Sequence, residues 1–347
     1  MSQSSMQTVS QAIHKALTIG ASFFAYRMPG EAHAEFGCQL PGIAHAAENR
    51  FVVHPFVATL SSPEVCIHAH LDAEAFLASQ HSGHQSLLPI TQSSTSLEQY
   101  LDMANRCIDA LRSGEVDKVV LSRVIVQDAG NRHWGERFVQ LANSMPHAFV
   151  FVFNTPATGA WMGASPELLL SAHDGKLNTM ALAATKAVDN HRSWTEKEIA
   201  EQHYVATYIE RTFVKLGLNY TKHPTTEMPA GNVQHICTPF SAVCTNQQQQ
   251  RLLLDALHPT PALAGVPKQK AIETILGLEQ HQRRYYGGYI GPQNADGNFN
   301  YFVNLRCMQF TLTQCCIYAG GGLTAQSVAI DEWHETQLKA QPLIAVI

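Results

Sequence analysis

The sequence predicts an α+β protein in which antiparallel sheets dominate. Segments rich in β-branched and aromatic residues follow one another in runs, and segments with helical spacing interrupt them only occasionally. A regular alternation of one strand with one helix, which is typical of parallel βαβ units, is not seen. A turn signal at Asp174-Gly175 joins two neighbouring strand-like segments, as in a hairpin.

The N-terminal part is expected to contain two helices and several short strands. Residues 7–19 are typical of an amphipathic helix, and residues 21–27 of a strand. Residues 29–95 are rich in His, Gly, Ser and Pro, so they are interpreted as short strands and loops. Residues 96–113 repeat apolar side chains at helical spacing, and Gly114 ends that helix.

The rest of the chain is expected to be mainly strands. Residues 116–128 are β-branched and predict a strand that is buried on both faces. Further strands are expected within 147–154, 159–185 and 315–323, a hairpin within 283–310, and helices at 195–217, 248–257, 267–280 and 331–346.

Composition predicts a chain with a sizeable core. Of 347 residues, 45% are hydrophobic and only 15% are charged, against roughly 25% charged in an average domain. Such a chain buries enough apolar surface to offset the entropy lost on ordering, so disorder is not expected. Length alone suggests about two domains, and one large domain remains an alternative.

Charge and apolar runs exclude several kinds of partner. A net charge of −5 argues against a nucleic-acid surface, which needs a basic face. No apolar run approaches the length of a membrane span, and no signal peptide is evident at the N-terminus. The eight cysteines show no metal-binding or C-x-x-C spacing, which is typical of reduced thiols in a cytoplasmic protein.

The helix at 195–217 carries carboxylates near its apolar stripe, taken as Ile199, Val205, Ile209 and Phe213. At about 100° per residue, Glu201 falls beside Val205, and Glu198 precedes it by one turn. A carboxylate on a core-facing stripe is costly unless it is paired or binds a metal. A partly exposed pair of surface glutamates is the alternative.

The C-terminal helix repeats this E-x-x-E spacing. Glu332, Glu335 and Lys339 lie three and four residues apart and therefore share one face. Two such carboxylate pairs could meet and hold a hard cation through oxygen ligands, and Mg²⁺ is the natural candidate. A solvated face with an ordinary Glu335–Lys339 ion pair is the alternative.

Three further features suggest a catalytic site. Lys118 lies in phase with Val116, Val120 and Val124 on a strand, and burial can turn a lysine into a general base, although a lone lysine at a strand start often reaches solvent. Glu167 precedes an apolar strand and could be a partly buried general acid, or simply a turn residue. The glycines within 318–323 could let backbone N–H groups approach a ligand carboxylate, but they do not form a dinucleotide motif.

The order of several motifs resembles that of the chorismate-utilising enzymes. The motifs are VDKVVLSR, GASPELLL, LAAT, HICTPF, LHPTPALAGVP, RRYYGGYIG, VNLRCMQF, YAGGGL and EWHETQLK. The resemblance covers residues 96–347 as a catalytic core, whereas residues 1–95 match weakly. It implies one chorismate-binding domain over 1–347, with two large antiparallel sheets packed face to face and helices outside. The composition-based estimate of two domains gives way to this expectation.

The resemblance also implies a role for each matched residue. Lys118 matches the base that activates water for attack at C2 of chorismate, and Glu167 matches the acid that protonates the departing C4 hydroxyl. The matched metal ligands are Glu201 and Glu335 for Mg²⁺, with Glu198 and Glu332 as supporting carboxylates. The matched substrate-binding residues are Thr185, His235, Ala262, Leu263, Tyr286, Arg306, Gly320, Gly322 and Lys339.

Within the family, the residues favour an isochorismate synthase. Ala183 stands where aminodeoxychorismate synthases carry a nucleophilic lysine, and Lys118 is typical of the branch that uses water. Ala262-Leu263 resembles isochorismate synthases in particular. A salicylate synthase, which also eliminates pyruvate, is the alternative, and a non-catalytic chorismate-binding relative ranks below it.

Two departures from the family pattern affect the site, and the partners follow from the same resemblance. Gln202 stands where relatives usually have His, and Ala184 replaces a common Gly. Neither change removes a proposed catalytic group. No obligatory glutaminase subunit is expected, and a monomer or weak homodimer is the expected state. The sequence leaves menaquinone and siderophore pathways open.

Overall fold

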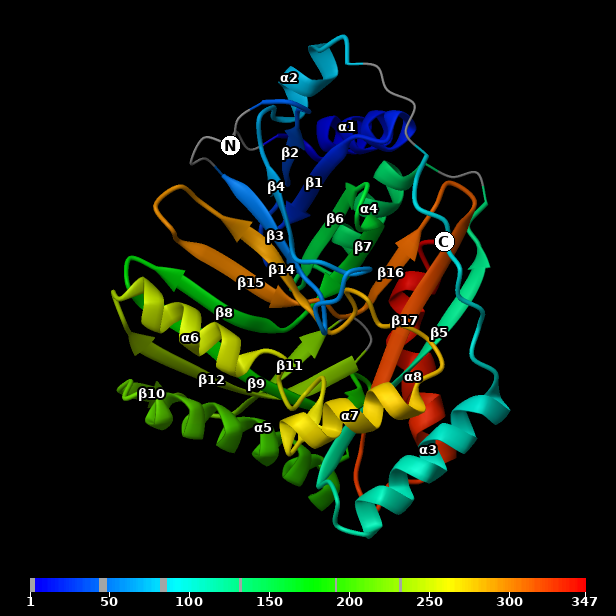
Figure 1. Cartoon of the computed structure of the whole chain (residues 1–347), viewed down its shortest axis with the longest axis vertical. Coiled ribbons are helices and arrows are strands. Elements are labelled where there is room, and N and C mark those ends of the chain that lie inside the picture. The colour runs from blue at the N-terminus through cyan, green and yellow to red at the C-terminus, as the bar shows by residue number, and fades with distance from the viewer. Residues whose placement is uncertain (1–3, 44–48, 82–85, 131–132, 191, 231–232) are drawn as a thin grey trace.

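The computed structural model of the chain describes residues 4–43, 49–81, 86–130, 133–190, 192–230 and 233–347. Two antiparallel sheets form its centre, and helices pack against them (Figure 1). The helices in this part of the chain are α1 (Met6–Ile19), α2 (Ala73–Ala78), α3 (Leu97–Arg112), α4 (Trp134–Ser144), α5 (Glu196–Lys215), α6 (Gln247–Leu257), α7 (Lys268–Leu278) and α8 (Ala329–Ile344).

In the described ranges, the first sheet has eight strands and the second has nine, and all their pairings are antiparallel. In spatial order, the eight-stranded sheet consists of β13 (Gly265–Val266), β5 (Lys118–Asp128), β17 (Gln314–Leu323), β16 (Cys307–Phe310), β7 (Gly159–Ser165), β6 (Phe149–Thr155), β1 (Ser22–Arg27) and β2 (Glu35–Gln39). The nine-stranded sheet consists of β10 (Tyr220–Lys222), β12 (Val233–Val243), β9 (Lys176–Ala187), β8 (Leu168–His173), β15 (Phe299–Val303), β14 (Tyr289–Gln293), β3 (Arg50–His54) and β4 (Val65–His68), with β11 (Thr226–Ala230) paired to β12. The predicted α+β class with two large antiparallel sheets is confirmed.

Aromatic side chains from both sheets pack against each other in the core. The ring of Phe149 on β6 stacks on Phe302 of β15 with centroids 4.2 Å apart. Phe24 on β1 stacks on Phe51 of β3 at 5.0 Å. All four side chains are buried. These contacts join the inner faces of the two sheets, which is how each sheet removes its apolar face from water.

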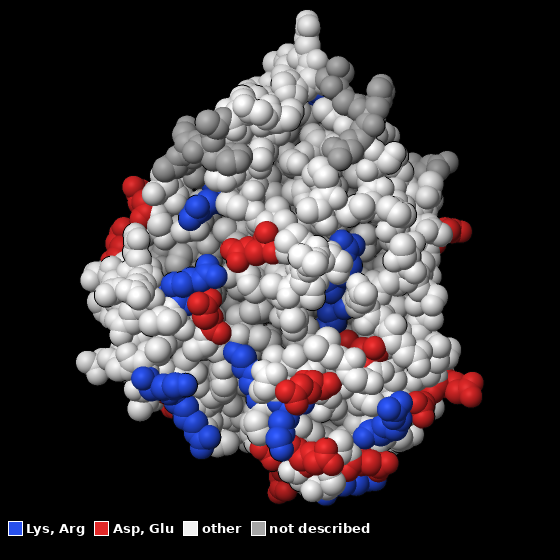
Figure 2. All heavy atoms as spheres, in the orientation of Figure 1, with Lys and Arg blue, Asp and Glu red and all other residues white. Residues whose placement is uncertain are grey.

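The helices cover the sheets in three groups (Figure 1). Helices α1 and α4 pack on the eight-stranded sheet near β1, β6 and β7, and α5 and α6 pack on the nine-stranded sheet at β8, β9 and β12. Helices α3, α7 and α8 gather round β5 and β17. Charged side chains are concentrated in the lower half of the face in Figure 2, and few are visible above it. Among the described residues, no helix has both the length and the apolar character that a membrane span needs.

Most predicted elements are present, with some differences. The hairpin at Asp174-Gly175 forms between β8 and β9, where both residues adopt positive φ (49° and 78°), as a two-residue hairpin turn requires. The segment 283–310 forms the hairpin β14–β15 but then continues into β16 of the other sheet. Helix α4 and strands β10–β13 were not expected from the sequence, and helix α2 lies in residues 29–95, which were interpreted as short strands and loops.

Among the several places where the chain passes from one sheet to the other, two lie next to each other. Between β7 and β8 the crossing residues are Pro166 and Glu167, and between β15 and β16 they include Arg306. The two crossings are hydrogen-bonded to each other, because Val303 N donates to Glu167 O over 2.9 Å and Ala164 N donates to Arg306 O over 3.0 Å. Glu167 and Arg306 are therefore held together although 139 residues separate them (306 − 167).

Candidate active site

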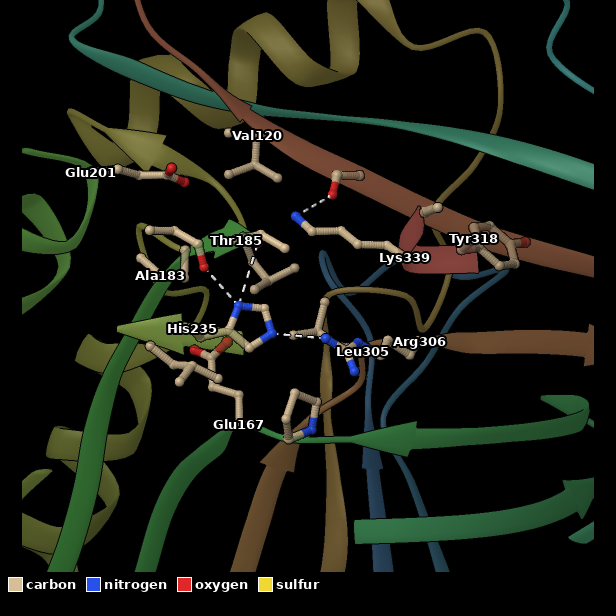
Figure 3. Close-up of a pocket in the computed structure, with 18 of the residues that line it drawn as sticks. Val120, Glu167, Ala183, Thr185, Glu201, His235, Leu305, Arg306, Tyr318 and Lys339 are labelled. Carbon is tan, nitrogen blue, oxygen red and sulfur yellow. Dashed lines mark hydrogen bonds between the residues drawn. The ribbon is translucent and has the colours of Figure 1, made fainter. Parts of the chain in front are cut away.

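A cavity lies at the two crossings, and side chains from both sheets and two helices converge on it (Figure 3). Its lining residues are Val120, Pro166, Glu167, Leu182, Ala183, Ala184, Thr185, Glu201, His235, Ala262, Leu263, Tyr286, Leu305, Arg306, Tyr318, Ala319, Gly320, Gly322 and Lys339. Eleven of the fifteen residues predicted to form the site are among them. The other four, Lys118, Glu198, Glu332 and Glu335, lie outside this lining.

Glu167 is a buried carboxyl group in this cavity. Its side chain is 2% exposed. Burial raises its pKa to about 8, and Lys118, Thr260 and Lys339 oppose that rise without cancelling it. Thr260 Oγ1 lies 3.4 Å from Glu167 Oε1. At neutral pH the group therefore holds a proton, as a general acid must.

Lys118, the first residue of β5, is completely buried, as its phase on the predicted strand indicated. Its Nζ lies 3.0 Å from Glu201 Oε1 on α5. A Cβ atom placed on Gly322 would be 3.0 Å from Lys118 Cε and 2.3 Å from Glu201 Oε1. Only glycine at position 322 leaves room for this ion pair beside the strand.

Arg306 and His235 form a hydrogen-bonded pair on one side of the cavity (Figure 3). His235 Nδ1 lies 2.7 Å from the carbonyl of Ala184 and donates to it, because a carbonyl can only accept. Nε2 is therefore the acceptor for Arg306 Nη2, at 2.8 Å. Burial and the guanidinium lower the pKa of His235 to about 3, so the imidazole stays neutral. Thr185 Oγ1 lies 3.4 Å from Nδ1.

The other two glycines of β17 also leave room for functional groups. A Cβ atom on Gly320 would be 2.7 Å from the hydroxyl of Tyr286. One on Gly321 would be 3.1 Å from Glu332 Oε2 and 3.6 Å from Glu335 Oε1 on α8. Strand β17 is therefore approached closely by carboxylates from two helices, α5 and α8.

Each of these carboxylates is paired with a lysine. Lys197 Nζ lies 2.5 Å from Glu332 Oε1, and Lys339 Nζ lies 2.7 Å from Glu335 Oε1, so the predicted Glu335–Lys339 pair is present. The second carboxylate oxygen of Glu332, Oε2, is also buried. Burial and the neighbouring Glu335 raise the pKa of Glu332, although Lys197 opposes the rise.

Glu198 lies apart from this group. Its carboxylate accepts two hydrogen bonds from Arg192, at 2.6 and 2.7 Å, and one from the hydroxyl of Thr195, the residue that caps α5. Glu198 does not line the cavity. Ile199 was also placed wrongly on the apolar stripe: it is 54% exposed, because six residues at 100° each turn it about 120° away from Val205.

The carboxylates offer the chemistry that Mg²⁺ needs but are not gathered round one point. Among the described residues, no group of three His, Cys, Asp or Glu side chains is arranged to hold a metal. Carboxylate oxygens are nevertheless the ligands that Mg²⁺ prefers. The glycines at 321 and 322 leave space for Glu201, Glu332 and Glu335 beside the strand, and Glu332 Oε2 is buried there. This donor set fits a hard divalent cation.

Sequence reasoning missed several residues of the site. Tyr318 lines the cavity, and its spacing of two from Gly320 and four from Gly322 on one strand could have revealed this. Lys197 is adjacent in sequence to the candidate Glu198 and could have been noticed for that reason. Its contact with Glu332 could not, because that contact joins helices α5 and α8, which are far apart in the sequence. Thr260 lies in the LHPTPALAGVP motif, in which only Ala262 and Leu263 were predicted to bind substrate.

Comparisons with known proteins identify the family and the fold. The family model described as "Chorismate binding enzyme" matches residues 3–347. The isochorismate synthase EntC of Escherichia coli K12 is 29% identical over 266 residues, covering 73% of this chain and 67% of the relative. The vibriobactin-specific isochorismate synthase of Vibrio cholerae is 27% identical over 310 residues, covering 85% and 75%. The structure of MenF, the menaquinone-specific isochorismate synthase of E. coli, has a TM-score of 0.80 at 18% identity, covering 100% of this chain and 92% of MenF.

Proposed function

The chain belongs to the chorismate binding enzyme family, and we propose that it is an isochorismate synthase. The reaction adds water at C2 of chorismate and removes the C4 hydroxyl. The observation that carries this proposal is a buried lysine, Lys118, next to a cavity that is lined by Glu167, whose pKa is raised to about 8. Lys118 is close enough to Glu167 to affect its pKa, and Ala183 supplies no amine nucleophile there.

Lys118 is the proposed base and Glu167 the proposed acid. As a neutral amine released from Glu201, Lys118 takes a proton from the water whose oxygen bonds to C2, the ring double bonds shift, and the C4–O bond breaks. Glu167 gives its proton to the departing hydroxyl, which leaves as water. One water enters and one leaves, so product and substrate are isomers. The raised pKa of Glu167, about 8, keeps this proton available at neutral pH.

Arg306 and the backbone at Gly320 and Gly322 are proposed to hold a substrate carboxylate, with Tyr286 beside them. The guanidinium is aimed by His235 and by its hydrogen bond to Ala230 O at 2.7 Å. Ala262, Leu263 and Thr185 are proposed to form further walls round the ring, and Lys339 also lines the cavity. A dianionic substrate would thus be bound by cations and glycine N–H groups.

Glu201 and Glu335 are proposed to hold Mg²⁺, with Glu332 and Glu198 in support. Bound there, the ion would screen a substrate carboxylate and withdraw electron density from the ring as a Lewis acid. The lysines that now pair with Glu201, Glu332 and Glu335 would have to give up those contacts. Glu198 would also need to leave Arg192.

The wider setting of the enzyme is proposed from the same comparison. Relatives are named for both vibriobactin and menaquinone, so the product is proposed to serve one of these two kinds of pathway. A cytoplasmic location, a monomer or weak homodimer, and activity without a glutaminase subunit are also proposed. The eight free cysteines are consistent with a reducing compartment.

Product analysis tests the proposal directly. Purified protein with chorismate and Mg²⁺, but without ammonia, is expected to form isochorismate, which chromatography detects. A coupled assay is expected to show no release of pyruvate. Lys118→Ala is expected to lower turnover by roughly 10²–10⁴ while chorismate still binds in calorimetry. Salicylate and pyruvate as main products would favour the salicylate synthase instead. Chorismate binding without any turnover would favour a non-catalytic relative.

A further inference from the structure

A buried ion pair lies next to the cavity without lining it. Glu279 follows α7, and Arg283 lies four residues later. Arg283 donates to the Glu279 carboxylate from Nε over 2.8 Å and from Nη2 over 2.6 Å. Each side chain is only 3% exposed. Because two charges have been removed from water here, the pair must make further hydrogen bonds to compensate.

The guanidinium makes those bonds to two walls of the cavity. Arg283 Nη2 also donates to the carbonyl of Val120 over 2.6 Å, and Nη1 donates to the carbonyl of Leu263 over 2.8 Å. Val120 is on β5 and Leu263 is in the segment between α6 and β13, and both line the cavity. The rigid, planar guanidinium thereby sets the distance between two segments that are far apart in the sequence.

The carboxylate holds β5 at a second point. Glu279 Oε1 accepts from the backbone N of Ser122 over 2.7 Å and from its hydroxyl over 2.8 Å. Ser122 is two residues after Val120 and pairs with Gly320 of β17. His281 Nε2 lies 2.9 Å from the same hydroxyl. Glu279, Arg283, Ser122 and His281 are called the Glu279 network below.

Tyr286 is connected to the same network. Its backbone N donates to Arg283 O over 2.9 Å, and its ring lies 5.6 Å from the guanidinium, whose other neighbour is Phe56 at 4.4 Å. The Tyr286 hydroxyl lies against Gly320. Arg283 therefore contacts Tyr286, a third wall of the cavity, as well as Val120 and Leu263.

We infer that the Glu279–Arg283 pair is a positioning device for the substrate cavity, which sets the separation of Val120, Leu263 and Tyr286. The inference rests on the proposed function, because it assumes that this cavity takes the substrate. The pair carries no net charge, so its effect is exerted through geometry. Neither Glu279 nor Arg283 touches the reacting atoms.

The variant Glu279→Gln/Arg283→Met tests the inference. It removes both charges together, which a buried pair often tolerates when size is kept, and it removes the donors to the carbonyls of Val120 and Leu263. The walls contact substrate before and during the reaction, so KM for chorismate is expected to rise at least tenfold while kcat falls less than threefold. Ser122→Ala is expected to raise KM in the same direction by a smaller factor.

Arg27→Met is the matched control. Arg27 is another buried arginine, and it donates to the carbonyls of Met145, Pro146 and Ala148, none of which lines the cavity. Its loss is expected to lower the melting temperature without changing KM. A folded double variant with KM within twofold of wild type would overturn the inference, and so would an equal rise in KM for Arg27→Met.

Two further measurements cover the remaining outcomes. If the double variant does not fold, the Ser122→Ala variant tests the inference in its place. An unchanged KM of Ser122→Ala for chorismate would then overturn the inference. If wild-type protein makes no isochorismate, the proposed function fails, and hydrogen exchange then tests the network by itself. Faster exchange in residues 118–123 and 260–266 of the Ser122 or double variant supports positioning, and unchanged exchange there contradicts it.

Discussion

Arg306 donates from Nη2 to Nε2 of His235 over 2.8 Å, while Nδ1 of the same ring is hydrogen-bonded to the carbonyl of Ala184. Both ring nitrogens are therefore used within the protein. The imidazole cannot readily give a proton to the substrate, because its only N–H is directed at a backbone carbonyl. These hydrogen bonds fix the direction of the Arg306 guanidinium.

Substitutions of His235 distinguish a role in orienting Arg306 from a role in proton transfer. His235→Gln keeps an acceptor near the position of Nε2, so KM and kcat are expected to stay within about threefold of wild type. His235→Phe removes the acceptor of a charged hydrogen bond, worth roughly 1.5–3 kcal/mol, and is expected to raise KM for chorismate by about 10–100-fold. Steady-state kinetics of the two variants measure this. A collapse of kcat in His235→Gln would instead indicate proton transfer by the ring.

The pKa of Glu167 predicts how activity and stability depend on pH. It is raised from 4.5 to about 8, so the folded protein binds this proton more tightly than the unfolded chain. The stability it contributes is present below pH 4.5 and is lost as pH rises to about 8. The kcat/KM profile is expected to fall above pH 8. Denaturant unfolding of wild type and Glu167→Gln, which mimics the protonated acid, should diverge between pH 5 and 8, and parallel stability curves would contradict the raised pKa.

Metal binding can be measured apart from activity. Glu335→Gln is expected to weaken Mg²⁺ binding at least tenfold in calorimetry with the metal alone, because a carboxamide loses the charge that a hard cation requires. Glu196→Gln is the control, since Glu196 is an exposed residue in the first turn of α5. Equal Mg²⁺ affinity in wild type and Glu335→Gln would place the metal elsewhere.

Ala184 is held in a conformation that favours glycine. Its φ is +62°, and a side chain with a Cβ atom pays roughly 1–2 kcal/mol there. Ala184→Gly is therefore expected to raise the free energy of unfolding by about 1 kcal/mol. Ala183→Gly, at a neighbouring position without positive φ, should lower it by roughly 0.5–1 kcal/mol. Thermal or denaturant unfolding distinguishes the two, and equal destabilisation would contradict strain at position 184.

The sequence predicted the strongly periodic elements and the buried ionisable groups. Helix α3 and strand β5 lie close to the expected ranges, because their patterns are long and consistent. Lys118 and Glu167 were singled out as charges next to apolar strands, and both are buried. Helix α4 was missed because its inner face includes Arg137, which is buried beside Phe138 and breaks the apolar pattern.

Side-chain partners could not be predicted in the same way. Glu198 satisfies the spacing of a ligand, but Arg192, only six residues earlier, takes its carboxylate. Lys197 reaches Glu332 across 135 residues of sequence. Such pairs depend on how helices α5 and α8 approach each other, and periodicity contains no information about that approach.

The two crossings between the sheets also bear on how this enzyme could fail. Glu167, the proposed acid, lies where the chain passes from one sheet to the other, whereas Lys118, the proposed base, begins a strand of the first sheet. The distance between Glu167 and Lys118 consequently depends on how the two sheets pack against each other. A substitution among the stacked phenylalanines of the core, remote from chorismate, could misalign proton donor and acceptor and slow turnover in a protein that still folds.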